Sequence, residues 1–147
     1  MTITTRTTEL EAVNTILSTI GEAPLSTLTG SLPVDGTTAK NILSEISREV
    51  QSAGWHFNSH YKVDLSRDSF NKIPIGTDVL RVELNDRYDK SSYDVVQRDS
   101  YLYNLAKNEE TFEQDFEDNI IVYLLDFSKL PEQARRYITI RSARVFH

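Results

Sequence analysis

Apolar residues recur at helical spacing near the start of the chain. Thr8 followed by Glu11 is the pattern of a capping box, in which each side chain bonds a free amide of the first helical turn. Gly21 supplies the left-handed residue that commonly ends a helix, and Pro24 prevents a restart. The pattern therefore predicts a first helix from about Thr8 to Gly21. Its apolar face consists of Leu10, Val13, Leu17 and Ile20.

A second helical pattern follows a loop that extends from Ser26 to Asp35. Asp35 or Thr37 is expected to cap this helix, since both residue types accept bonds from first-turn amides. Gly54 is expected to end it, and the aromatic residues Trp55 and Phe57 come directly afterwards. The apolar stripe of this helix consists of Ala39, Ile42, Leu43, Ile46, Val50 and Ala53.

The middle of the chain changes from helical spacing to alternation of apolar and polar residues, which is typical of half-buried strands. The expected strands are Tyr61 to Leu65, Leu80 to Leu84, Tyr93 to Val96, Tyr101 to Leu105 and Ile120 to Phe127. In the first of these, Tyr61, Val63 and Leu65 share the inner face. The last has a continuous apolar run that predicts burial on both faces. Lys107 to Asp118 is strongly acidic and is expected to be an exposed loop or a short surface helix.

Helical spacing returns after Pro131, a residue that suits the first helical position. The predicted inner face consists of Ala134, Tyr137, Ile138, Arg141 and Val145. The chain stops at Arg144–His147 without a cap, a glycine or a polar tail, so we expect an interrupted helix. The fold class that follows is α+β: a helical core (1–58 and 128–147) carrying a β-rich insertion (59–127).

Composition changes this picture in two respects. The chain has 147 residues, no cysteine and no long apolar run, so we expect no disulfide, no signal peptide and no membrane span. The net charge is −6, but the charge is uneven: residues 59–127 hold fifteen acids against eight bases, whereas residues 128–147 hold one acid against five bases. An acidic chain disfavours tight DNA binding. The basic end is either a solvated face, a site for an acidic partner, or a nucleic-acid site.

Few residues offer catalytic or metal chemistry. His56 and His60 have a metal-ligand spacing, but Gly54 has just ended the helix and no third ligand is near. The aspartates Asp86, Asp89, Asp94 and Asp99 lack the spacing of a calcium loop. There is no phosphate-binding glycine loop and no nucleophile elbow. We therefore expect no metal, no cofactor and no enzymatic activity. A carboxylate pair in the acidic middle leaves a small hydrolase or carbohydrate-active enzyme as the alternative.

Several short sequence motifs together resemble those of one known family. They are Ala12-Val13-Asn14, Ile20-Gly21-Glu22-Ala23-Pro24, Ser26-x-Leu28-x-Gly30, the run from Val50 to Asn58, the run from Leu130 to Ile138, and Arg141-Ser142-Ala143-Arg144. The chain resembles the tail tubular protein A family, the head-to-tail adaptors of short-tailed bacteriophages. The likeness spans most of the chain and is strongest at its two ends.

The resemblance implies a structural virion protein. Such proteins form a ring of about twelve copies that joins the portal protein to the tail nozzle, a tail tubular protein B, and leaves a channel for DNA. It also implies assembly in the host cytoplasm, no membrane, and DNA passing without specific binding. Family chains usually continue beyond the point where this sequence stops.

A ring needs two different surfaces on each copy. We expect the acidic insertion and the basic last helix to attract one another between neighbours. The expected interface residues are Arg135, Arg136, Arg141, Arg144, Trp55 and Phe57. A cytoplasmic interaction module without viral context is the third hypothesis.

Overall fold

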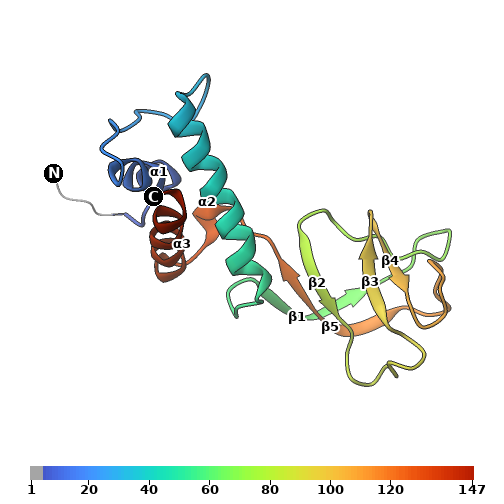
Figure 1. Ribbon diagram of the computed structural model, residues 1–147. Coiled ribbons are helices and arrows are strands. Elements are labelled where there is room, and N and C mark those ends of the chain that lie inside the picture. The colour runs from blue at the N-terminus through green and yellow to red at the C-terminus, as the bar shows by residue number, and fades with distance from the viewer. Residues whose placement is uncertain (1–4) are drawn as a thin grey trace. The chain divides into compact units, whose positions relative to one another are not determined.

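The computed structural model describes residues 5–147 (Figure 1), so the first residues of the threonine-rich start lie outside it. The elements run in the order α1 (Glu9–Ser18), α2 (Val34–Ser52), β1 (Ser59–Leu65), β2 (Val79–Glu83), β3 (Val95–Arg98), β4 (Tyr101–Asn104), β5 (Phe116–Tyr123), the 3₁₀ helix η1 (Phe127–Lys129) and α3 (Glu132–Phe146). Two N-terminal helices and one C-terminal helix enclose the strands in sequence, which confirms the predicted α+β class.

The chain divides into two compact units. Residues up to Ala53 and Leu125–His147 make the helical unit, and Gly54–Leu124 make the strand unit. The boundaries predicted from sequence, after residues 58 and 127, lie a few residues later than the boundaries between these two units, after residues 53 and 124. Asn58 belongs with the strands because it exchanges two hydrogen bonds with Tyr123: its Nδ2 donates to the carbonyl at 2.9 Å, and its own carbonyl accepts the Tyr123 N–H at 2.8 Å.

α1 is closed at both ends by the groups that the sequence predicts. Thr8 Oγ1 accepts the Glu11 N–H at 3.1 Å, and Glu11 accepts the Thr8 N–H at 3.4 Å, which completes the capping box. Beyond the helix, Gly21 has φ 74° and the Glu22 N–H reaches the Leu17 carbonyl at 3.2 Å. That 6→1 bond is part of a Schellman motif, which requires a residue with positive φ and so favours glycine.

The buried stripe of α1 differs in part from the prediction. Val13 and Leu17 are buried as expected, but Leu10 is only half-buried. Ile20 is 42% exposed because α1 ends at Ser18 and the closing turn leads away from the core. The other buried residues of α1 are Ala12 and Ile16.

α2 begins earlier than predicted and has no side-chain cap. Its N-cap is Pro33, which accepts the Thr37 N–H at 3.0 Å through its carbonyl, so neither Asp35 nor Thr37 acts as the cap. Gly36 fits close packing, because a Cβ there would lie 2.9 Å from a methyl of Leu25. Ala53, predicted to be buried, is exposed because it is the C-cap.

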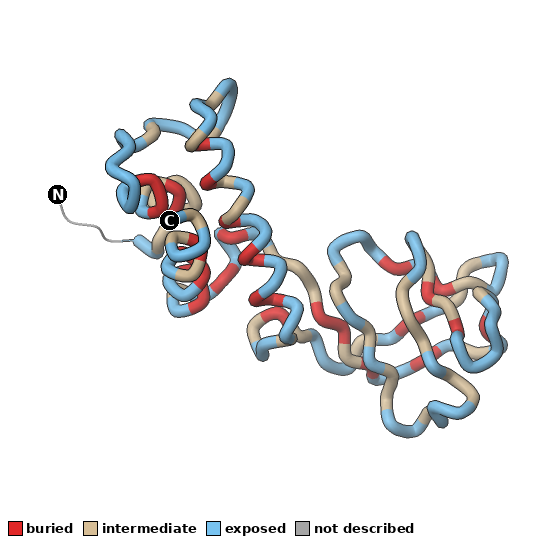
Figure 2. Tube along the Cα trace, in the orientation of Figure 1, coloured by how far each residue is buried: buried red, intermediate tan, exposed pale blue. Residues whose placement is uncertain are grey.

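The core of the helical unit lies where the three helices face one another, as the buried positions in Figure 2 show. Ile16 and Ile138 are fully buried, and each burial contributes roughly 1.5–3 kcal/mol of transfer free energy. The surrounding buried residues are Val13, Leu17, Ala39, Leu43, Ile46, Phe127, Leu130 and Ala134. Among the described residues, no helix is long and apolar enough to cross a membrane.

The strand unit contains an antiparallel sheet in the order β1-β5-β2 and a separate β3–β4 hairpin (Figure 1). β5 is central: its Ile121 pairs with His60 of β1 on one side and with Val82 of β2 on the other. β1 contains a bulge at Lys62, whose φ is 57°. The bulge breaks the alternation, so Tyr61, predicted to face inward, is 62% exposed.

β5 begins and ends earlier than the predicted strand from Ile120 to Phe127. It ends at Tyr123, and Phe127 lies in η1, so the second half of that prediction is wrong. Leu125 cannot extend the ladder because both its N–H and its carbonyl bond the Gln51 side chain. The predicted acidic loop ends earlier as well, since Phe116 already belongs to β5.

Phe116 is the centre of the strand unit's core. It is fully buried, and Tyr88, Tyr93 and Phe112 meet it edge-on at centroid distances of 4.8, 5.0 and 5.5 Å. Edge-to-face contacts of this kind add stability beyond the burial of apolar area. The buried cluster around it consists of Leu65, Ile73, Ile75, Leu102, Phe112 and Ile121.

Candidate assembly surfaces

α3 presents a different face to its core from the one predicted. Its buried residues are Ala134, Arg135, Ile138, Thr139 and Ser142. Tyr137 and Val145, both expected inside, are 52% and 58% exposed. Val145 is exposed although its angular position matches the buried face, because it lies in the last turn of the helix. Tyr137 is displaced from the core because an arginine occupies the inner position beside Ile138.

That arginine, Arg135, is 5% exposed and bonds backbone oxygens on three sides. Its guanidinium donates to the carbonyls of Leu130 and Thr7, each at 2.8 Å, and to that of Ser128. It also lies over the ring of Phe127, 5.7 Å from the centroid. Arg135 was predicted as an interface residue, but its guanidinium is used within its own chain to hold the segment before α1 and the turn before α3.

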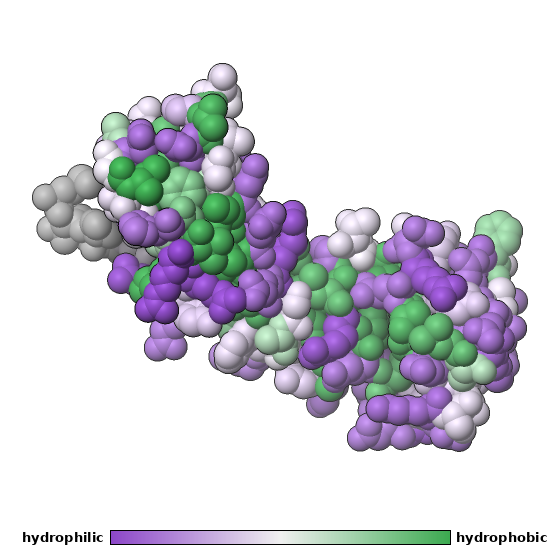
Figure 3. Space-filling view, in the orientation of Figure 1, coloured by the Kyte–Doolittle hydropathy of each residue, from purple (hydrophilic) through white to green (hydrophobic). Residues whose placement is uncertain are grey.

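Of the remaining arginines of α3, one is half-buried against α2 and two are exposed. Arg141 Nη2 donates to Glu49 of α2 at 2.5 Å, with both side chains partly exposed. Arg136 and Arg144 are exposed. With Gln133, Tyr137 and Ile140 they lie on one side of the helix at three- and four-residue spacing. We call this set of five residues the α3 outer face. Figure 3 shows hydrophobic surface among polar groups on the visible side of the helical unit.

Trp55 and Phe57 lie in the turn that begins the strand unit. Their rings stack at 6.4 Å with an interplanar angle of 6°. Asn58 Oδ1 accepts the Trp55 N–H at 2.9 Å, which fixes the turn. Trp55 remains 48% exposed, an exposure compatible with a contact to another molecule. Their predicted role at an interface stays a prediction.

The strand unit contains a pocket of about 750 Å³. Its walls come from β2, from the loop that follows β2, and from parts of β3 and β5. Apolar and aromatic side chains form much of the lining: Val82, Leu84, Tyr88, Tyr93, Val95 and Ile120. Its volume lies within the range of ligand-binding clefts, roughly 300–1,000 Å³. Most of the lining lies between Val82 and Val95, and β5 adds Asp118 and Ile120. Sequence reasoning missed the pocket because a turn-rich stretch does not show that its side chains enclose a concave surface.

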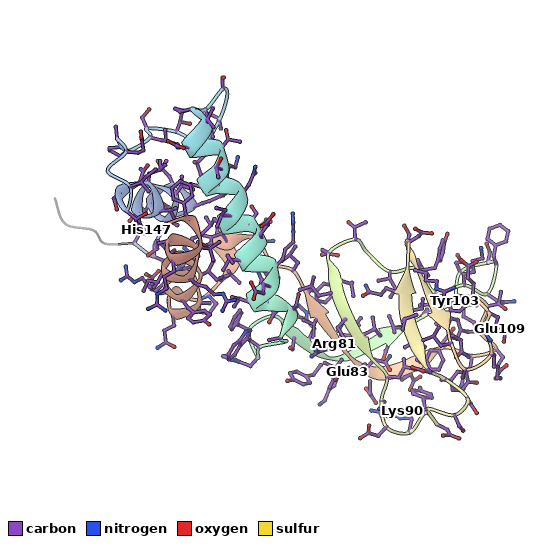
Figure 4. All side chains as sticks on the ribbon, viewed as in Figure 1. Arg81, Glu83, Lys90, Tyr103, Glu109 and His147 are labelled. Atoms are coloured by element: carbon purple, nitrogen blue, oxygen red, sulfur yellow. The ribbon has the colours of Figure 1, made fainter. Side chains whose placement is uncertain are left out.

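The charges around this pocket are mostly negative, and we call it the acidic pocket. It is lined by Glu83, Asp86, Asp89, Asp94 and Asp118, with Lys90 as the basic residue of the lining. Figure 4 labels Glu83 on β2 and Lys90 on the loop that follows it. Arg87 pairs with Asp118 at 2.6 Å and compensates that charge. Arg81 likewise pairs with Glu83 at 3.4 Å. The remaining carboxylates, Asp86, Asp89 and Asp94, still outnumber Lys90.

Hydrogen bonds favour one protonation state for each of two groups at this pocket. The Ser91 hydroxyl and N–H donate to Asp89 and lower the pKa of its carboxyl. The Tyr93 hydroxyl donates to Glu113 at 2.5 Å, a bond that raises the pKa of Tyr93. Asp89 is therefore ionised and Tyr93 protonated at neutral pH, so the pocket combines negative charge with an apolar wall.

The histidines and aspartates that were weighed as metal ligands have other surroundings. His60 on β1 meets Tyr123 edge-on at 4.6 Å, and His56 packs against Phe57 at 5.8 Å. Asp99, at φ 54°, lies in the turn between β3 and β4, away from the aspartates of the acidic pocket. Within residues 5–147, no three histidine, aspartate or glutamate side chains are grouped so that they hold a metal ion.

The fold and these surfaces define a class: an α+β protein with a basic, partly apolar helix face and an acidic concave surface, both suited to contacts between macromolecules. The family model for tail tubular proteins matches residues 10–147, so the chain belongs to the tail tubular protein family. It is therefore a structural component of a bacteriophage tail and part of the virion. No curated protein matches the chain.

Proposed function

We propose that this chain is a ring-forming, non-enzymatic adaptor that joins the phage portal to the tail nozzle. The observation that carries the proposal is membership of the tail tubular protein family over residues 10–147. The presence of a basic helix face and an acidic pocket on the same chain supports it, since a ring needs two different surfaces on each copy. Such a ring assembles in the host cytoplasm before it joins the virion.

The adaptor ring encloses the channel through which DNA leaves the capsid. The net charge of −6 supports passage without binding, because an acidic protein releases few counterions from a phosphate backbone. We expect no measurable affinity for duplex DNA at physiological salt. Salt-resistant binding of short duplexes, measured by fluorescence anisotropy, would contradict this part of the proposal.

The alternative function, a carboxylate-based hydrolase, needs a general acid with a raised pKa. The carboxyl groups of Asp89, Glu113 and Asp115 instead have pKa values below their usual range, because hydroxyl, amide, ammonium or guanidinium groups donate to them. A group that gives up its proton so readily is a poor general acid at neutral pH. Asp89, Glu113 and Asp115 are therefore poor candidates for that acid.

The test is to image the full chain by negative-stain electron microscopy and weigh it by native mass spectrometry, alone and with the portal protein. We expect closed rings of about twelve copies in at least one of the two samples. A monomer that persists in both samples would overturn the proposal. Turnover on a panel of glycans by such a monomer would favour the hydrolase.

A further inference from the structure

The α3 outer face has the composition of a contact surface. Tyr137 is 52% and Ile140 45% exposed, and the exposed Arg136 and Arg144 flank them. Tyrosine and arginine are enriched among the residues that dominate binding energy at protein interfaces. Covering this face removes apolar area from water, which is favourable if the arginines find partners of opposite charge.

The acidic pocket offers those partners beside an apolar wall. Val82, Val95 and Ile120 contribute apolar surface, while Asp86 and Asp94 are exposed carboxylates of the same lining. The two surfaces are thus complementary in both respects: apolar beside positive on α3, and apolar beside negative in the pocket. Complementary charge of this kind sets orientation and accelerates association.

We propose that the α3 outer face of one copy docks at the acidic pocket of the next copy. The two surfaces belong to different units of the same chain, so every copy supplies one of each, as a head-to-tail contact requires. This inference rests on the proposed ring, because only a closed ring satisfies all such contacts at once. It assigns Tyr137 and Ile140 as the apolar contacts, and Arg136 and Arg144 as the charged ones.

Charge reversal on the two surfaces tests the docking. One variant carries Arg136→Asp and Arg144→Asp, and the other carries Asp86→Lys and Asp94→Lys. In a sample of either variant alone, like charges face each other at every contact between copies. We therefore expect association at least tenfold weaker than in the wild type. In an equal mixture, a ring in which the two variants alternate brings opposite charges together at every contact. Assembly should therefore return in the mixture.

The control is Arg48→Asp on the exposed side of α2, which reverses one charge that belongs to neither surface. It should assemble as the wild type does. Sedimentation velocity at two salt concentrations gives the association, and circular dichroism confirms that each variant is folded. Reversed variants that assemble as the wild type does, or a mixture that gains nothing over its components, would overturn the proposal.

Cross-linking tests the same contact without assuming a closed ring. The chain has no cysteine, so single cysteines react only where they are introduced. Tyr137→Cys and Asp94→Cys, on chains that differ in mass through a tag, should form a mixed disulfide under mild oxidation. Tyr137→Cys paired with Ser44→Cys, on the exposed side of α2, is the control and should not.

The outcomes separate the two proposals. Rings without the mixed disulfide would overturn the docking and leave the adaptor function intact. The mixed disulfide without rings, even with the portal protein, would support the docking and overturn the proposed function. The absence of both would overturn both.

Discussion

Gln51 and the backbone of Leu125 form a reciprocal pair. Gln51 Nε2 donates to the Leu125 carbonyl at 3.0 Å, and Gln51 Oε1 accepts the Leu125 N–H at 2.8 Å. Gln51 is fully buried, and its Nε2 also donates to Ser47 at 2.9 Å. The amide thus satisfies both polar groups of Leu125 where β5 has ended and no strand partner remains to bond them.

Gln51→Ala should destabilise the helical unit by about 1–2 kcal/mol, because it leaves partly buried backbone groups of Leu125 without these partners. The measurement is urea unfolding followed by circular dichroism at the helical band. Asn41→Ala, an exposed change on the same helix, is the control and should stay within about 0.5 kcal/mol of the wild type. Equal effects of the two changes would contradict the role assigned to Gln51.

Arg135→Ala should cost about 2–4 kcal/mol, because it removes donors from three carbonyls and leaves a cavity beside Phe127. Its neighbour provides the control: Arg136→Ala alters an exposed side chain and should change stability by less than about 0.5 kcal/mol. Urea unfolding of both variants measures the difference. If the two costs were the same, Arg135 would not be the structural anchor described above.

Phe116→Ala should destabilise the strand unit by about 3–5 kcal/mol, since a fully buried ring that meets three others is lost. Trp55 is the single tryptophan of the chain and lies in the strand unit, so its fluorescence follows the unfolding of that unit. Phe70→Ala removes a ring that is 74% exposed and should have little effect. A small loss for Phe116→Ala would place the core elsewhere.

Glu132 should make the helical unit sensitive to acid. The Thr7 hydroxyl and N–H donate to its carboxylate at 2.6 and 2.7 Å and lower the pKa of Glu132 below its usual value of 4.5. A lowered pKa in the folded state stabilises the protein above about pH 4.5, and the contribution is lost as pH falls through the folded pKa. The Tm difference between the wild type and Glu132→Gln should therefore be largest at neutral pH and shrink toward about pH 3.

Thr7→Val is the companion variant for that prediction, because it removes only the hydroxyl donor. It should reproduce part of the loss, and the double variant should lose less than the sum of the two. A Tm difference that stays constant from neutral to acid pH would show that the bond contributes nothing through ionisation.

The sequence by itself determined the features that depend on near neighbours along the chain. The capping box needs only Thr8 and Glu11, and the end of α1 needs only the positive φ that Gly21 tolerates. The alternation of β2 and the position of β4 follow from the same short-range logic, whereas β3 lies two residues later than the strand predicted from Tyr93 to Val96. The family could also be recognised from the sequence, because the resemblance rests on the order of short motifs along the chain.

Tertiary structure decided the features that depend on distant backbone groups. Arg135 faces inward and Tyr137 outward because the carbonyls of Thr7 and Ser128 need a donor, and no periodicity encodes that need. Gln51 ends the apolar run of β5 by bonding Leu125, although the run itself favours a longer strand. The acidic pocket is completed only where the pairing of β2 with β5 sets Ile120 opposite Glu83. A pattern along the chain records which residues avoid water, whereas the partners of buried polar groups are fixed only when the chain has folded.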